Sequence, residues 1–188
     1  MKSRIITIAG ALGSGKSSTA NRVAAELGYR RFSSGDLFRA IAAERGISVE
    51  QVNRQAEVEQ EIDHAVDQRL RDMASESELV IDSRMAFHWM PESFKVYLAL
   101  DPKAAAERIH SHIKTEGRVG ETGETVEEVY ASIVRRRESE QKRYMSLYAI
   151  DVLDTSSFDL VIDTATKNLD GVATEVLERY RAWLGAER

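Results

Sequence analysis

The chain has 188 residues, a formal net charge of −5, 43% hydrophobic residues and no cysteine. This length suits one well-buried domain, so we expect a single domain over residues 1–188. The negative net charge argues against a surface that binds nucleic acid non-specifically. The lack of cysteine excludes disulfides and thiolate metal sites. With no cleavable leader and no apolar run of membrane length, we expect a cytoplasmic protein without membrane or nucleic-acid partners.

The first predicted strand, residues 5–9, leads into Gly10-Ala11-Leu12-Gly13-Ser14-Gly15-Lys16-Ser17, which fits G-x-x-x-x-G-K-[ST]. In such a P-loop, backbone N–H groups turn inward around a polyphosphate, Lys16 reaches the outer phosphates, and the Ser17 hydroxyl suits Mg²⁺. A chance glycine-rich turn would have to match four fixed positions between a strand and an amphipathic helix, which makes it the weaker interpretation. The pattern therefore predicts nucleoside triphosphate binding by Gly10, Gly13, Ser14, Gly15, Lys16, Ser17 and Ser18.

Strand-like and helix-like segments alternate along the rest of the chain, which is typical of βαβ units around a parallel sheet. A helix over residues 16–27 should stop at Gly28, and one from about 35 to 45 should stop at Gly46. Ser48 and Gln51 form a capping-box pair that predicts one further helix continuing to about residue 73. The other strands are expected at residues 29–32, 79–82, 95–100 and 159–163, and the other helices at about residues 102–114, 126–148 and 169–184.

A predicted strand leads directly into a predicted helix over Ser33-Ser34-Gly35-Asp36-Leu37-Phe38-Arg39. The helix has a positively charged residue, Arg39, one turn after its start. Most arginines on a helix face are solvated, but here small residues leave room for a ligand beside Arg39. Together with the P-loop, the segment resembles the nucleoside monophosphate kinase family, in which it receives the acceptor nucleotide. The resemblance implies an acceptor-binding region over residues 35–74, with contacts from Ser34, Gly35, Asp36 and Arg39.

The resemblance extends over nearly the whole chain. The segments 136–144, 148–151 and 159–164, which read RRESEQKRY, YAID and DLVIDT, look like those of the short type of cytidylate kinase. This implies an α/β P-loop kinase fold with a five-stranded parallel sheet of order 2-3-1-4-5, helices on both faces and a small lid. It also implies the use of ATP and Mg²⁺ to phosphorylate CMP or dCMP.

Three charged residues, Arg136, Glu140 and Arg143, stand at i, i+4 and i+7 of one predicted helix and therefore share a face. Taken alone, they would more naturally form a solvated ion-pair ladder. Phosphoryl transfer, however, needs several cations that converge on one spot. By resemblance, Arg136 meets transferring or acceptor phosphate, Glu140 meets the sugar hydroxyls, and Arg143 meets the pyrimidine edge.

Asp82 ends the third predicted strand, where a carboxylate lies beside the P-loop and can hold Mg²⁺ together with Ser17. Arg84, two residues later, can reach the acceptor phosphate. Ser83 stands where the short cytidylate kinases usually have glycine. It either closes space near the acceptor or hydrogen-bonds the base, so the identity of the base stays open.

The glycine-bearing stretch from Thr115 to Thr125 predicts a mobile loop and resembles the lid that closes over the triphosphate. Closure would exclude water, which competes as an acceptor. His112 stands near a position at which the family often has arginine. By resemblance, the ATP side also includes Arg108, Arg118, Thr164 and Ala165.

The residues expected to act on the transferring phosphate are Lys16, Arg84, Arg118 and Arg136. Three alternatives remain: a kinase for another nucleoside monophosphate, a kinase for another small molecule, and a non-catalytic P-loop switch. A GTPase would need N-K-x-D, which the segment over residues 166–170 does not supply. This chain supplies all of the positively charged side chains that the reaction needs, so no partner protein has to contribute an arginine. The partners expected are therefore nucleotides, and a monomer is favoured over an oligomer.

Overall fold

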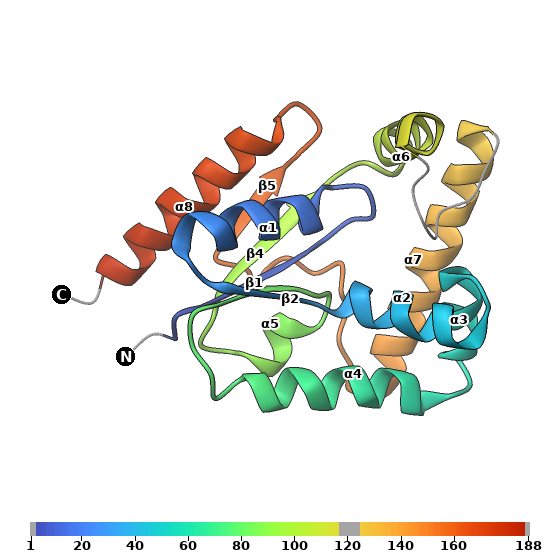
Figure 1. The fold of residues 1–188 in the computed structure, drawn as a ribbon, viewed down its shortest axis with the longest axis horizontal. Helices are drawn as coiled ribbons and strands as arrows, with labels where there is room; N and C mark the ends of the chain where they lie inside the picture. The colour runs from blue at the N-terminus through green and yellow to red at the C-terminus, as the bar shows by residue number, and fades with distance from the viewer. Residues whose placement is uncertain (1–2, 117–124, 187–188) are drawn as a thin grey trace.

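The computed structural model describes residues 3–116 and 125–186 of the chain (Figure 1). Its centre is a five-stranded sheet in the order β2-β3-β1-β4-β5, in which all neighbouring strands run parallel. The predicted topology is therefore confirmed. The strands are β1 (Ile5–Gly10), β2 (Arg30–Ser33), β3 (Leu79–Asp82), β4 (Phe94–Ala99) and β5 (Leu160–Asp163).

The two faces of the sheet are covered by different helices. Ile6, Ile8 and Val80 pack in one hydrophobic cluster with α1 (Lys16–Leu27) and α8 (Leu169–Gly185). The alternate positions Ile5 and Leu79 face the opposite cluster. This alternation follows from the period of two along a strand, and it explains why β1 is buried at every position.

The glycine stops of the first two helices lie where the sequence predicts them. α1 ends at Gly28, with φ 69°, and α2 (Ser34–Arg45) ends at Gly46, with φ 64°. In both caps the glycine N–H donates to a carbonyl of the last turn. The left-handed conformation, which glycine adopts without a Cβ penalty, ends each helix and turns the chain into the next element, β2 after Gly28 and the helix over residues 49–55 after Gly46.

The single helix expected from residue 48 to about 73 is wrong, because the structure has two helices there. α3 (Val49–Gln55) begins with the predicted capping box of Ser48 and Gln51, and α4 (Gln60–Met73) follows after a turn. One straight helix of that length would extend roughly 39 Å at about 1.5 Å per residue. Instead α3 packs against α7 (Val126–Tyr148), while α4 packs against α5 (Ala86–Trp89). No glycine or proline marks the break, so tertiary packing decides it.

α6 (Pro102–Glu116) and α7 form a packed pair at the end of the sheet (Figure 1). The buried side chains of this pair make a third, separate cluster that includes Ile109 and Ile133. The short helix α5 was not predicted from the sequence, and α6 continues two residues beyond its expected end. Most of the predicted lid, residues 117–124, lies outside the described residues, while Thr125 caps α7 by accepting from the Glu128 N–H at 3.2 Å.

Because all five strands are parallel, their carboxyl ends meet at one edge of the sheet. The segments that follow β1, β2, β3 and β5 bring part of the predicted site to that edge, and α6 and α7 carry Arg108, Arg136, Glu140 and Arg143. Within residues 3–116 and 125–186, no helix has both the length and the apolar character that crossing a membrane requires.

Candidate active site

The P-loop after β1 is fixed by its glycines. Gly10 has φ 140°, and a Cβ at this position would lie 2.2 Å from the Leu98 carbonyl oxygen on the neighbouring strand. Gly13 and Gly15 also have positive φ, 72° and 85°. Only glycine fits Gly10, since any side chain would collide with backbone. The sequence pattern therefore predicted a real backbone requirement.

Lys16 lies over its own loop. Its Nζ donates to the Gly10 carbonyl at 3.0 Å and to the Ala11 carbonyl at 2.6 Å. Burial and the nearby guanidinium of Arg84 together lower the pKa of Lys16 to about 7. The side chain is therefore about half protonated at neutral pH in this arrangement, and an anion placed in the loop would favour its charged form.

Ser17 and Asp82 lie together at the carboxyl ends of β1 and β3. The Ser17 hydroxyl donates to Asp82 Oδ2 at 2.5 Å, and the Ser33 hydroxyl donates to the same oxygen at 3.3 Å. Asp82 is buried, and Arg31 approaches it at 3.5 Å. Among the described residues no group of three or more His, Cys, Asp or Glu could hold a metal. A hydroxyl and one carboxylate nevertheless suit Mg²⁺, which keeps several waters and takes further oxygens from phosphates.

Glu140 joins two arginines that come from different parts of the chain. Its carboxylate pairs with Arg84, which follows β3, and accepts from Arg136 Nε at 3.1 Å on the same helix. Arg84 also donates to the Gly10 carbonyl, which places it beside the P-loop. Burial alone would raise the pKa of Glu140, but the charges of Arg84 and Arg136 outweigh it and lower that pKa. Glu140 is therefore a stable carboxylate that fixes two cations at one place.

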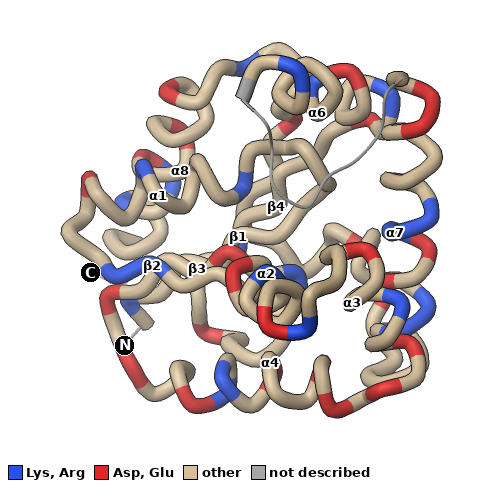
Figure 2. The backbone as a smooth tube through the Cα atoms, turned by 45° about the vertical axis from the view of Figure 1, so that its right-hand side comes forward, with Lys and Arg blue, Asp and Glu red and all other residues tan. Residues whose placement is uncertain are grey.

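These groups surround a cavity of about 630 Å³ between the P-loop, α2, α6 and α7. Figure 2 shows α6 above the carboxyl ends of β1 and β4, α2 and α3 below them, and α7 beside them. His112, the departure from the family pattern, also faces this cavity. The predicted site residues that line it are Gly13, Gly15, Lys16, Ser17, Ser18, Ser34, Gly35, Arg39, Asp82, Ser83, Arg84, Arg108, Arg136 and Glu140.

Several other predicted residues lie near the cavity without lining it: Gly10, Ser14, Asp36, Arg143, Thr164 and Ala165. Asp36 pairs with Arg39 and, at 3.0 Å, with Arg31. Arg108 explains the position of Thr164, because its guanidinium donates to the Gly13 carbonyl at 3.2 Å and to the Thr164 carbonyl at 2.9 Å. Arg118 lies outside the described residues.

Arg143 is buried behind the cavity wall. Its guanidinium donates to both oxygens of Asp63, at 2.9 and 3.3 Å, and to the Asn53 carbonyl at 3.1 Å. Burial raises the pKa of Asp63, although Arg143 opposes the shift. Arg143 thus shares a helix face with Glu140 but meets an acidic partner from α4 instead of the cavity. Its predicted contact with a pyrimidine stays a prediction.

Sequence reasoning missed five residues at or near the site. Phe38, Asn53 and Tyr144 line the cavity, Arg31 contacts Asp82, and Asp63 holds Arg143. Burial raises the pKa of Tyr144, so its hydroxyl remains a hydrogen-bond donor at neutral pH. Tyr144 stood in the quoted segment beside Arg143 and was within reach of the sequence analysis. Asn53 and Asp63 come from helices whose separation had no local signal.

Comparison with known proteins adds to this geometry. The model of the cytidylate kinase-like family matches residues 5–166. A cytidylate kinase of Methanothrix thermoacetophila is 37% identical over 178 residues, which cover 95% of this chain and 98% of the relative. A cytidylate kinase of Pyrococcus furiosus is 36% identical over 170 residues, covering 89% and 83%.

Solved structures of lower identity share the fold. An uncharacterized protein from Eubacterium ventriosum superposes with a TM-score of 0.69 at 16% identity, covering 95% of this chain and 98% of its own. Shikimate kinase from Bacteroides thetaiotaomicron gives a TM-score of 0.62 at 14% identity, covering 96% and 98%. At these identities the likeness supports the architecture alone.

Proposed function

The chain belongs to the cytidylate kinase-like family, and we propose that it transfers the terminal phosphoryl group of ATP to CMP, giving ADP and CDP. One observation carries the proposal. A single cavity has the P-loop at one end, the segment from Ser34 to Arg39 at the other, and the Arg84–Glu140–Arg136 cluster facing it. This is the arrangement that in-line transfer between two bound phosphates requires.

At the donor end, backbone N–H groups of the P-loop and Lys16 hold the triphosphate. Arg108 links the P-loop to the end of β5 through Gly13 and Thr164, so we assign it to the ATP side. Thr164 and Ala165 would then border the adenine. Ser17 and Asp82 would hold Mg²⁺, which supplies charge neutralisation between the outer phosphates when bound.

At the acceptor end, Arg39 and Arg84 would bind the phosphate of CMP, with Ser34, Gly35 and Asp36 shaping the entry. Arg136 would face the transferring group. Glu140, held as a carboxylate by its two arginines, is placed to accept hydrogen bonds from sugar hydroxyls. The chain supplies positioning and positive charge, and phosphoryl transfer of this kind requires no covalent intermediate.

The base would lie against Phe38, Asn53 and Tyr144. Arg143 is one residue from Tyr144 and is bonded to the Asn53 carbonyl, so it supports this part of the wall. Ser83 is buried at the same cavity, where its hydroxyl accepts from the Met85 N–H at 3.4 Å and donates to none of the residues that the structure describes. Its hydroxyl proton is available to an acceptor nucleotide.

The test is a panel of acceptors in a coupled assay of ADP release with ATP and Mg²⁺. CMP, dCMP, UMP, AMP, GMP and shikimate are compared by kcat/KM. We expect CMP or dCMP to give the highest value. If a purine nucleotide or shikimate is the best acceptor, the protein is still a phosphotransferase, but the assignment of CMP as its acceptor is contradicted.

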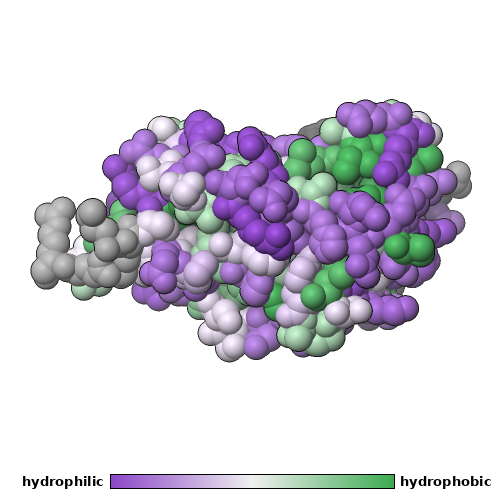
Figure 3. All heavy atoms as spheres, turned by 90° about the horizontal axis from the view of Figure 1, so that it is seen from below, coloured by the Kyte–Doolittle hydropathy of each residue, from purple (hydrophilic) through white to green (hydrophobic). Residues whose placement is uncertain are grey.

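We further propose that the enzyme acts as a cytoplasmic monomer. Hydrophilic side chains cover most of the face seen in Figure 3. The large exposed apolar side chains are spread over different elements: Val58, Tyr130, Met145, Val161 and Leu169. Size-exclusion chromatography with light scattering should give one 21.1 kDa species, with and without nucleotides.

A further inference from the structure

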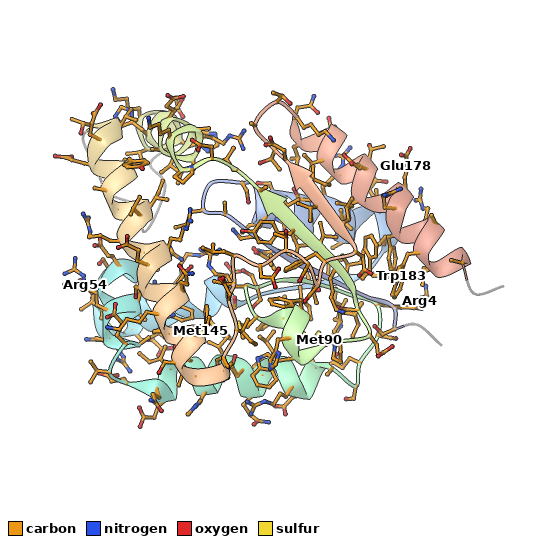
Figure 4. All side chains as sticks on the ribbon, turned by 180° about the vertical axis from the view of Figure 1, so that it is seen from behind. Arg4, Arg54, Met90, Met145, Glu178 and Trp183 are labelled. Atoms are coloured by element: carbon orange, nitrogen blue, oxygen red, sulfur yellow. The ribbon has the colours of Figure 1, made fainter. Side chains whose placement is uncertain are left out.

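A second cavity of about 250 Å³ adjoins the back of the P-loop. Its walls come from β4, the first turns of α6, the middle of α7 and the connection from α7 to β5. Figure 4, seen from behind, shows β4, β5 and α7 with this connection running between them. We call it the rear cavity. It shares Leu12, Arg84 and Glu140 with the active-site cavity, so these three residues separate the two spaces.

The rear cavity has a mostly apolar lining with two free donors. Among the described residues, none hydrogen-bonds to or pairs with the exposed guanidinium of Arg137, and none bonds to the Tyr97 hydroxyl. Three carboxylates line it and each has a partner: Asp101 accepts from the Lys103 N–H at 2.8 Å, Asp163 accepts from the Ala165 N–H at 2.9 Å, and Glu140 pairs with Arg84 and Arg136. The polar groups left for a ligand are therefore the Arg137 guanidinium and the Tyr97 hydroxyl, which can both donate to an anion.

The size of the rear cavity limits its occupant. A volume of 250 Å³ is below the roughly 300–1,000 Å³ of pockets that enclose drug-sized ligands. A nucleotide is too large, and an inorganic anion would leave the apolar walls without contacts. The lining that includes Leu100, Ile133 and Leu153 instead fits a compact aromatic or branched hydrocarbon body.

We propose that the rear cavity binds a small organic carboxylate with an apolar body, and that its occupancy weakens binding of the acceptor nucleotide. The carboxylate would meet Arg137 and Tyr97, and the body would fill the apolar part. The coupling half of this proposal rests on the proposed function. The binding half does not, because it is measured without turnover.

The coupling follows from the shared wall. In the present arrangement Arg84 is held by Glu140 and by the Gly10 carbonyl. An occupant that packs against the back of this pair stabilises that arrangement, in which Arg84 is less available to an acceptor phosphate. By thermodynamic reciprocity, CMP must weaken binding of the carboxylate by the same factor.

Binding is tested with benzoate as the probe, followed by heteronuclear NMR of the full chain. We expect saturable shifts at residues of the rear cavity, with a Kd on the order of millimolar for so small a ligand. Arg137→Ala should weaken benzoate about tenfold, as expected for loss of a partly exposed charge-assisted contact. Arg135→Ala, an exposed arginine two positions earlier on α7, is the matched control and should leave the affinity unchanged.

Two further arms make the result specific. Val152→Trp should fill the rear cavity from the connection to β5 and abolish the shifts. The neutral isostere benzamide should bind the wild type about tenfold more weakly than benzoate.

In the coupled assay, benzoate should raise the KM for CMP in the wild type and in Arg135→Ala, but not in Val152→Trp. Benzoate shifts that persist in both Arg137→Ala and Val152→Trp, or that centre on Ser34 to Arg39, would place the probe in the active site and overturn the proposal. If the wild type binds benzoate as expected but does not phosphorylate CMP, the proposed function is contradicted and the binding half of the proposal stands.

Discussion

The donor and acceptor ends of the active-site cavity are built in different ways. The donor end comes from one contiguous segment between β1 and α1, and its shape is fixed by backbone, most clearly at Gly10, where no Cβ fits. The acceptor end is assembled from α2, α3, α4 and α7, and buried ion pairs such as Asp63 with Arg143 hold it together. Local geometry therefore controls the donor end, and side-chain pairing over long sequence separations controls the acceptor end.

This difference has consequences for how each end tolerates change. Under the proposed function, a substitution such as Lys16→Ala at the donor end removes a group that would act directly on the transferring phosphate. At the acceptor end, each arginine is part of a pair, so a substitution also leaves its carboxylate without one partner. We expect donor-end variants to lose turnover and acceptor-end variants to change the use of the monophosphate.

The largest effect is expected for Lys16→Ala. Lys16 supplies a positive charge at the outer phosphates, and its loss should lower kcat/KM on the order of a thousandfold or more. The two carbonyls that Lys16 bonds belong to Gly10 and Ala11, which line the rear cavity, so water can replace the lost bonds and the fold should persist. The coupled assay measures kcat/KM, and thermal unfolding shows whether the variant is as stable as the wild type. Turnover close to that of the wild type would contradict the assignment of the P-loop to ATP.

Arg39→Ala and Arg84→Ala should separate the two ends. Each removes a charge-assisted contact of about 1.5–3 kcal/mol to the acceptor phosphate, or roughly 10- to 150-fold in its affinity. ATP affinity, measured by calorimetry without acceptor, should change much less. Arg54→Ala is the matched control, since Arg54 lies on α3 and points to the outside of the acceptor region, where it pairs with Glu50 (Figure 4). Equal losses of ATP and CMP affinity would show that the two ends have been assigned wrongly.

Arg143→Ala should reduce the preference for CMP over UMP and AMP, by about tenfold for one lost hydrogen-bonding group. Removal of Arg143 also leaves Asp63 buried and unpaired, which costs about 3–5 kcal/mol of stability. A double variant, Asp63→Leu with Arg143→Met, removes both charges and should recover much of the stability. The acceptor panel then decides the role. A preference for CMP that survives in the stable double variant would assign Arg143 to structure alone.

Much of the fold could be predicted because its signals are local. The P-loop glycines, the stops at Gly28 and Gly46, and the buried strand runs each depend on neighbouring residues. The break between α3 and α4 could not be predicted, since it depends on α3 meeting α7 and α4 meeting α5. The same cause hid Asn53 and Asp63 from the sequence analysis. The sequence pattern placed Arg136, Glu140 and Arg143 on one helix face, but only the structure shows that Arg136 and Glu140 line the cavity whereas Arg143 pairs with Asp63.

The smallest predicted effect tests the donor end through pH. Burial and Arg84 hold the pKa of Lys16 at about 7 in the free protein. The anionic triphosphate must raise that pKa, so ATP binding takes up a proton whenever the free lysine is neutral. ATP affinity should therefore fall as the pH rises past 7, by about fivefold between pH 7 and pH 8 if the bound lysine stays charged.

Calorimetry with ATP and no acceptor measures the dependence, and repeating it in buffers of different ionisation enthalpy counts the protons. Lys16→Arg keeps its charge at every pH in this range, so its ATP affinity should stay level. The acceptor end predicts no such slope, because the pKa of Arg84 is raised above its already high ordinary value: burial would lower it, but the charge of Glu140 outweighs burial. Affinity for CMP in the absence of ATP should accordingly be flat from pH 7 to pH 8. A slope for CMP as steep as that for ATP would mean that a group other than Lys16 titrates in the cavity.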